Sequence, residues 1–205
     1  MELNQYEKWW DNKIVNESYT TMDSFRKVLD RNGSRALYLD VINKFEPKSI
    51  LDVGCGLGLD YQLYKDNSID IEYHGIDVCK GFIEENKKNF PETDWKWAKS
   101  YDIPFDKKSI DLVTCRGVLE HLKDPYETIQ EMKRVSKKYI SIIWFLIPQK
   151  KEIIKKTQSG FYRNIYSIEK INTFFQKHNL NILYKDQVKD NKSPMKYHEM
   201  WMIEK

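Results

Sequence analysis

Glycines at alternate positions close a short apolar run and form a candidate site for a nucleotide-like ligand. Residues 50–53 have the length of a buried strand, and residues 59–64 can continue as a helix. The glycines between them are Gly54, Gly56 and Gly58. Glycine adopts positive φ and lets a ligand approach the backbone, while a helix start offers N–H groups without helical partners. The stretch 49–58 therefore predicts a strand, a tight turn and a helix start that bind a nucleotide-type cofactor.

An acidic residue ends the next strand-like segment. Residues 71–77 alternate in polarity and end in Asp77, which lies 23 residues after Gly54. In a β-α-β unit with a right-handed crossover, this separation brings the carboxylate beside the glycine loop, where it can accept hydrogen bonds from both ribose hydroxyls. The alternative is that Asp77 caps the helix that follows. The glycine turn at this separation favours ribose binding.

Strand and helix patterns alternate along most of the chain. Further strands are predicted at 95–98, 109–115, 138–147, 181–185 and 198–203. Further helices are predicted after the caps Ser34 and Ser167, at 81–89, and after the Asp124 cap with Pro125 at its first position. This alternation indicates an α/β fold with a parallel sheet and ligands outside the carboxyl ends of its strands.

Composition indicates one domain. The 205 residues are 40% hydrophobic, enough for one sizeable core, and we expect residues 1–47 to form an N-terminal helical flank of the domain that continues over 48–205. Aromatic residues of the flank, including Trp10 and Tyr19, could form a lid over the cofactor and contact the acceptor, or simply extend the core. The net charge of +3, from 34 basic and 31 acidic residues with the signs interspersed, gives no indication of nucleic-acid binding.

Three cysteines lack CxxC spacing, so we expect small buried hydrophobes and no metal or disulfide framework. The longest apolar run, 140–148, is short of the about 18 residues that a membrane span needs. The N-terminus also lacks the basic and apolar regions of a secretory signal. A cytosolic protein is expected.

The spacing of the glycines distinguishes two cofactor classes. A dinucleotide dehydrogenase places a third glycine at position 59, where this chain has Leu59. With Asp52 in front and Gly58 at its end, the stretch instead resembles the class I S-adenosylmethionine-dependent methyltransferases, in particular the small-molecule group called type 11. The resemblance runs from about residue 49 to 139 and implies a Rossmann-like, seven-stranded, mostly parallel sheet with helices on both faces.

The resemblance also implies roles for individual residues. The glycine loop would pass under the methionine part of the cofactor, Asp52 would fix this loop and the cofactor amino group, and Asp77 would bind ribose. Residues 103–113 and 118–121 resemble the family's loop-and-strand block and the segment lining the methyl-transfer pocket. The implied cofactor-binding residues are Asp52, Gly54, Cys55, Gly56, Asp77, Val78, Lys99, Ser100, Tyr101, Cys115 and Arg116.

One position departs from the family pattern. Lys99 stands where many members carry an acid that bonds the adenine amino group. Because lysine cannot accept that bond, a backbone carbonyl or Ser100 has to substitute.

Two polar residues follow the fourth predicted strand. His121 has the pKa range of a general base, although a histidine here can also pack against the cofactor or cap the next helix. Arg116 would lie near the methionine carboxylate or an acidic acceptor; otherwise it is a surface residue paired with Glu120.

The acceptor should be recognised by the flanks. In the connection 148–166, Tyr162, Arg163 and Asn164 could clamp a sugar or an anion, or the loop could merely be anchored by its aromatics. His198 on the last strand is assigned to the core or rim. We expect methyl transfer from S-adenosylmethionine, leaving S-adenosylhomocysteine, to an O or N of a small metabolite or glycan precursor.

Two other functions stay open at this point. One is a regulatory protein that binds the cofactor or a nucleotide without catalysis, which Lys99 makes conceivable. The other, nucleic-acid methylation, lacks an Asn-Pro-Pro-Tyr-like motif and a basic flank. We expect no nucleic-acid or membrane partner, and the sequence leaves the oligomeric state open.

Overall fold

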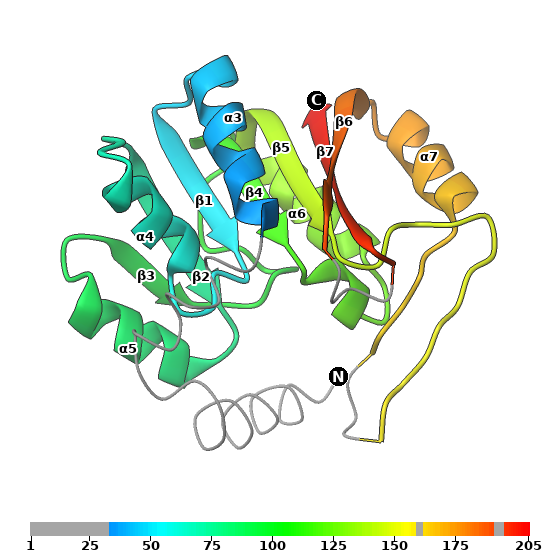
Figure 1. Cartoon of the computed structure of the whole chain (residues 1–205), viewed down its shortest axis with the longest axis horizontal. Coiled ribbons are helices and arrows are strands. Elements are labelled where there is room, and N and C mark those ends of the chain that lie inside the picture. Colours follow the sequence, from blue (N-terminus) through cyan, green and yellow to red (C-terminus); the bar gives the residue numbers. More distant parts are fainter. Residues whose placement is uncertain (1–32, 159–161, 191–194) are drawn as a thin grey trace.

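The computed structural model describes residues 33–158, 162–190 and 195–205 (Figure 1). The predicted helices before residue 33, and with them Trp10 and Tyr19, lie outside the described residues. In the part of the chain that is described, no helix has the length and apolarity to cross a membrane.

A seven-stranded sheet forms the centre of the molecule, with strand order β3-β2-β1-β4-β5-β7-β6. Neighbours among the first five strands of this order pair parallel, whereas β7 pairs antiparallel with both β5 and β6. The strands are β1 (Ser49–Val53), β2 (Glu72–Asp77), β3 (Asp94–Trp97), β4 (Ile110–Arg116), β5 (Ser136–Trp144), β6 (Asn181–Lys189) and β7 (Tyr197–Glu204). The predicted mostly parallel Rossmann-like sheet is therefore confirmed.

Helices cover both faces of the sheet (Figure 1). They are η1 (Gly33–Arg35), α3 (Ala36–Phe45), α4 (Leu59–Asp66), α5 (Lys80–Asn89), η2 (Leu119–His121), α6 (Tyr126–Val135) and α7 (Ile168–Lys177). Successive β1 residues point to opposite faces: Ile50 belongs to a core shared with α3, α4 and α5, and Leu51 to one shared with α6 and α7. This explains why β1 is buried along its whole length and needs a layer on each side.

Of the three predicted helix caps, one is correct and two are displaced. Ser167 caps α7 as expected, with its Oγ accepting a hydrogen bond from Lys170 N at 3.4 Å. Ser34 is not the cap of α3, because the 3-10 turn η1 leads directly into the helix and Arg35 occupies the cap position in helical conformation. The cap position of α6 is Pro125, and Asp124 accepts a hydrogen bond from Tyr126 N at 2.8 Å.

Two strands differ from their predicted bounds by more than one residue. β5 ends at Trp144 although the apolar run continues, because Phe145 N donates to the Glu120 carboxylate at 3.0 Å instead of continuing the ladder. β6 extends to Lys189, further than its pattern predicts, because its polar second half still pairs with β7.

The connection after β5 leaves the body of the domain and returns as two extended segments, coloured yellow to orange in Figure 1. Isolated bridges join Gln149 to Ser167, Ile153 to Ile165 and Lys156 to Tyr162. We call the described residues of this connection, 149–158 and 162–167, the excursion.

Candidate functional site

The carboxyl ends of the parallel strands bring the predicted site residues to one edge of the sheet. Gly54 follows β1, Asp77 ends β2 and Arg116 ends β4. β1 lies between β2 and β4, so these three chain segments are direct neighbours. A crevice outside the carboxyl ends of neighbouring parallel strands is the usual ligand position in such sheets.

The glycine loop has left-handed backbone geometry, with φ of 80° at Gly54, 54° at Gly56 and 70° at Gly58. A Cβ added to Gly54 would lie 2.3 Å from Cγ2 of Val118, so packing within the chain requires glycine there. A Cβ added to Gly56 would meet no atom of the described residues within 4 Å. The open side of Gly56 is thus a cradle that any side chain would fill, which fits a ligand that approaches the backbone.

Asp77 connects this loop to the second strand. Its Oδ2 accepts a hydrogen bond from Gly56 N at 2.9 Å, and its Oδ1 accepts one from Cys79 N at 2.8 Å. Cys79 is the cap residue of α5, so Asp77 also braces that helix start. Burial raises the pKa of Asp77, and its backbone hydrogen bonds oppose the rise. A carboxylate offers about four acceptor directions, so the carboxylate of Asp77 can still accept a hydrogen bond from a ligand hydroxyl beside its backbone donors.

Asp52 does not hold the loop as expected. It is buried, and its Oδ2 accepts a hydrogen bond from the Tyr73 hydroxyl at 2.6 Å. Among the described residues, the loop is fixed instead by Asp77, by the Ile76 carbonyl, which accepts from Gly54 N and Cys55 N, and by Asn86, whose Nδ2 donates to Gly56 O at 2.8 Å. Burial and the neighbouring charge of Asp60 raise the pKa of Asp52 to about 7.

Asn86 is a residue that the sequence analysis missed. It is fully buried on the inward side of α5, beside the buried Phe82 and Ile83. A polar residue on the apolar face of a helix is the signal that could have identified it, because buried polar side chains need hydrogen-bond partners.

A cluster of charged side chains lies beside the loop. Arg116 Nε is 3.2 Å from Asp60 Oδ2, and Arg35 Nε is 2.7 Å from Asp60 Oδ1. The expected alternative of a surface arginine paired with Glu120 is therefore wrong, because Arg116 is buried against Asp60. Burial and the nearby guanidinium of Arg116 lower the pKa of Arg35 to about 10.

The cluster carries more positive than negative charge. The carboxylate of Asp60 stands between the guanidinium groups of Arg35 and Arg116, and Nη1 of Arg35 is buried without a hydrogen-bond partner in the described part of the chain. An anionic group of a ligand would satisfy both the charge and this donor. Arg35 precedes the stretch that the resemblance covers, so only the three-dimensional structure brings it here.

The segment after β4 is fixed from two sides. Oε1 of Glu120 accepts from Phe145 N, and the Glu120 carbonyl accepts from Asn164 N at 2.8 Å. His121 Nδ1 lies 2.8 Å from the carbonyl oxygen of Tyr162. Because a carbonyl only accepts, Nδ1 carries the hydrogen and Nε2 carries the lone pair.

The excursion contributes less to an acceptor site than expected. Asn164 is fully buried, its Nδ2 donates to Leu122 O at 2.7 Å, and its Oδ1 accepts from Lys155 N at 3.0 Å. The side chain of Asn164 therefore connects backbone segments and is not accessible to an acceptor. The prediction that Asn164 contacts the substrate is corrected accordingly. Tyr162 and Arg163 are half-buried and exposed, so they keep accessible side chains.

Four further residues predicted to bind the cofactor follow the ends of β2 and β3. Val78, Lys99 and Ser100 are half-buried, and Ser100 Oγ is 2.8 Å from Thr128 Oγ1. Tyr101 is exposed. Trp97, which the sequence analysis passed over, is 42% exposed, and its Nε1 donates to Val78 O at 2.7 Å. An exposed indole held at the end of β3 offers a flat apolar surface next to Val78.

Cys115 is a predicted cofactor residue whose side chain lies in the hydrophobic core. It is buried in the core shared with α6 and α7, and burial raises the pKa of its thiol. The expectation of a small buried hydrophobe is correct for Cys115, and its predicted cofactor contact is reduced to the backbone. Cys55 and Cys79 are buried as well.

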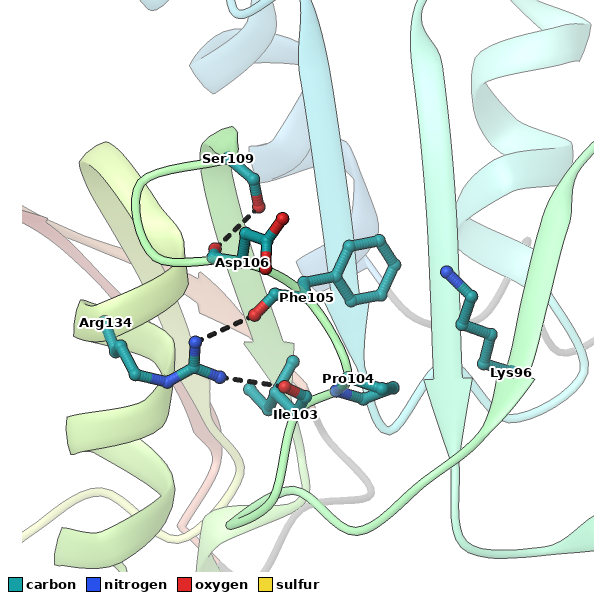
Figure 2. A pocket seen from close by; sticks show the side chains of 7 residues that line it. All are labelled: Lys96, Ile103, Pro104, Phe105, Asp106, Ser109 and Arg134. Atoms are coloured by element: carbon teal, nitrogen blue, oxygen red, sulfur yellow. Dashed lines mark hydrogen bonds between the residues drawn. The ribbon is translucent and has the colours of Figure 1, made fainter.

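A hollow of about 540 Å³ lies elsewhere (Figure 2). It is lined by Lys96, Ile103, Pro104, Phe105, Asp106, Ser109 and Arg134. Arg134 donates to the carbonyls of Ile103 and Phe105, both at 2.8 Å, and thereby shapes the loop that enters β4. Because Ser109 precedes β4, this hollow borders the amino end of that strand, away from the glycine loop.

Comparisons with known proteins agree with this geometry. Residues 51–140 match the family model described as a methyltransferase domain. A ubiquinone biosynthesis O-methyltransferase of Saccharophagus degradans is 31% identical over 127 residues, which is 60% of this chain and 49% of that protein. A demethylmenaquinone methyltransferase of Paenarthrobacter aurescens is 25% identical over 103 residues, 50% of this chain and 40% of that protein. The chain thus spans about half the length of the curated relatives it matches, or less.

Solved structures show the same fold. A Burkholderia thailandensis 1,6-didemethyltoxoflavin-N1-methyltransferase, with bound 1,6-didemethyltoxoflavin and S-adenosylhomocysteine, is 9% identical with a TM-score of 0.72, covering 100% of this chain and 91% of that chain. A Pyrococcus horikoshii protein is 12% identical with a TM-score of 0.68, covering 96% of this chain and 98% of that chain.

Proposed function

We propose that this chain, whose residues 51–140 form a methyltransferase domain of the class I S-adenosylmethionine-dependent type, transfers a methyl group from S-adenosylmethionine to a small acceptor. The observation that carries the proposal is the pairing of an open Gly56 cradle with the half-buried carboxylate of Asp77. The cradle accommodates a ligand against the backbone, and the carboxylate keeps acceptor directions for ribose hydroxyls.

The charged cluster supports the other end of the cofactor. Arg35 and Arg116 together outweigh Asp60, and the unpartnered Nη1 of Arg35 fits a carboxylate such as that of the methionine part. Val78, Lys99, Ser100 and Tyr101 would surround adenine, with Trp97 as an additional wall. Because the Lys99 side chain only donates, backbone groups or Ser100 would accept from the adenine amino group.

The bound cofactor would supply an electrophilic sulfonium methyl group, so the chain mainly has to position the acceptor and exclude water. His121 is held by the Tyr162 carbonyl at the edge where β4 ends, and it would line the acceptor side. Tyr162 and Arg163 would contribute from the excursion.

We propose an O or N of a small metabolite or glycan precursor as the methylated atom, in a cytoplasmic enzyme without a nucleic-acid partner. The names of two relatives, a ubiquinone biosynthesis O-methyltransferase and a demethylmenaquinone methyltransferase, refer to small molecules, which supports a small-molecule acceptor. A regulatory protein that binds the cofactor without catalysis is the second candidate, because Lys99 departs from the usual adenine contact.

Calorimetric titration with S-adenosylmethionine and with S-adenosylhomocysteine tests the proposal. We expect both to bind, and binding of neither would refute it. Incubating the protein with a cell extract and methyl-labelled cofactor then separates the two candidates. Label in a small-molecule fraction supports the enzyme, whereas cofactor binding with no transfer to any fraction supports the regulatory protein.

A further inference from the structure

A second histidine lies at the active edge of the sheet. β7 runs antiparallel to β5, with Glu199 opposite Trp144, so the start of β7 lies beside the end of β5. His198 stands at this start, and only 4% of its side chain is exposed. The antiparallel strand therefore delivers a buried imidazole to the edge at which Arg116 and His121 lie.

His198 forms a dyad with an acid from the neighbouring strand. Its Nε2 lies 3.2 Å from Oδ2 of Asp190, the residue that follows β6. Asp190 N donates to Lys196 O at 2.9 Å, which fixes the acid relative to the start of β7. A carboxylate only accepts hydrogen bonds, so the hydrogen is on Nε2 and the lone pair is on Nδ1.

Nδ1 of His198 is the unsatisfied side of this dyad. It is buried and has no hydrogen-bond partner among the described residues. Since it carries a lone pair, the missing partner is a hydrogen-bond donor, such as a hydroxyl. A buried acceptor that the chain itself leaves unpaired points to a ligand group that completes it.

The surroundings connect the dyad with the ends of β4 and β5. The His198 ring stacks on Phe145 with centroids 4.2 Å apart and an interplanar angle of 22°. The Phe145 ring in turn lies against Gly117, because a Cβ added to Gly117 would be 2.4 Å from Cε2 of the ring. The centroid of the Phe145 ring is 5.4 Å from the guanidinium carbon of Arg116. His198 is thus part of one wall with the residues that follow β4.

Charges facing the imidazole act in opposite directions. Burial and Arg116 lower the pKa of His198, whereas Asp190 raises it, and the net effect is a lowered pKa. The ring is therefore neutral near pH 7, the state in which a histidine can accept a proton.

We propose that His198 is the general base of the reaction and that the methyl acceptor is a hydroxyl compound whose O–H hydrogen-bonds to Nδ1. The inference rests on the proposed function and refines its acceptor class from O or N to a hydroxyl. As the acceptor oxygen forms its bond to the methyl carbon, the carbon–sulfur bond breaks with its electron pair going to sulfur. The hydroxyl proton passes to Nδ1, and Asp190 stabilises the resulting imidazolium.

Imidazole ¹⁵N NMR of the protein saturated with S-adenosylhomocysteine tests the hydrogen bond without turnover. We expect His198 to show a protonated Nε2 and an unprotonated Nδ1, and excess phenol, as a hydroxyl probe, to shift the Nδ1 resonance. Anisole, which lacks the donor, is the matched control. An Nδ1 resonance that phenol leaves unchanged, as expected if the atom holds only a structural water, would overturn the proposal.

The second test measures the rate of methyl transfer to the small-molecule fraction that became labelled in the cell-extract experiment. We expect His198→Asn to lower kcat by about 10²–10⁴ and to remove the acidic limb of the pH–kcat profile, with cofactor affinity unchanged. Asp190→Asn, which keeps a hydrogen-bond acceptor without the charge, should give a smaller loss, and His178→Asn at the end of α7 should give none.

The same loss in His121→Asn but not in His198→Asn would assign the base to His121. Failure of the parent protein to bind cofactor would instead refute the proposed function.

Discussion

The carboxylate of Asp77 accepts a hydrogen bond from the backbone N–H of Gly56 at 2.9 Å, so the acid at the end of β2 and the loop after β1 form one unit. The proposed ribose site is therefore arranged by the chain's own hydrogen bonds. Because preorganised groups lose less freedom on binding, this contact should contribute to cofactor affinity in two ways, as a direct partner and as a support of the loop.

Replacing Asp77 tests this double role. We expect Asp77→Ala to weaken binding of S-adenosylmethionine by roughly 1.5–3 kcal/mol, the scale of hydrogen bonds to a charged group. Titration calorimetry measures the change. Glu72→Gln, an exposed position on the same strand, is the control and should leave the dissociation constant unchanged. Equal affinity of Asp77→Ala and the parent protein would remove Asp77 from the site.

Two glycine substitutions should separate packing from ligand binding. Gly56→Ala places a methyl group in open space and costs only the strain of positive φ, about 1–2 kcal/mol, but it obstructs the cofactor. Gly54→Ala drives its methyl group into Val118 and should destabilise the fold more strongly. Thermal unfolding and calorimetry together check this. Tight cofactor binding by a folded Gly56→Ala protein would show that the ligand lies elsewhere.

The raised pKa of Asp52 predicts a pH-dependent stability. The folded protein keeps a proton on Asp52 up to about pH 7, whereas the unfolded chain releases it near 3.8, the ordinary value. The unfolded state thus binds fewer protons between these limits, and this group lowers the free energy of unfolding as the pH rises through them.

Asp52→Asn keeps an oxygen that can accept from Tyr73 and removes the titration. Relative to the parent protein, we expect it to be about equally stable at pH 4 and more stable by roughly 1–3 kcal/mol at pH 8. Urea unfolding at both pH values measures the difference. A difference between the two proteins that is the same at both pH values would show that Asp52 titrates normally.

Arg35 can be tested with two ligands that differ in one part. Arg35→Met should weaken S-adenosylmethionine binding about tenfold or more, since a charge-assisted hydrogen bond to the carboxylate is lost. Binding of 5′-methylthioadenosine, which lacks the amino-acid part, should stay unchanged, and calorimetry with both ligands gives the comparison. Equal weakening for both would assign Arg35 to the structure of the loop rather than to carboxylate recognition.

The order of the elements was predictable where the evidence is local in the sequence. The glycine loop, Asp77 and the strand–helix alternation each lie in short segments, and the structure places them as expected. The partners of Asp52 and Arg116 were not predictable, because each side chain pairs with a residue of another element. Asp52 accepts a hydrogen bond from Tyr73, and Arg116 forms an ion pair with Asp60.

The same limit explains the errors in the excursion. Asn164 belongs to a polar, aromatic segment typical of a binding loop, yet its amide satisfies backbone groups of Leu122 and Lys155. Whether Asn164 contacts a ligand or braces the backbone depends on how the connection folds back on η2. The spacing of residues within the segment does not determine this. His198 was assigned to the core for a similar reason, since its pairing with Asp190 arises only when β7 pairs with β6.

In the excursion, packing and accessibility fall to different residues, which suits laboratory evolution. Its inner residues, Asn164 and Tyr166, bond the backbone of the segment following β4, whereas Tyr162 and Arg163 present accessible side chains. Randomising the outer pair while retaining the inner pair should yield libraries of stable proteins with altered acceptor preference. The outer residues of the excursion can therefore be exchanged while its inner residues keep it attached to the domain.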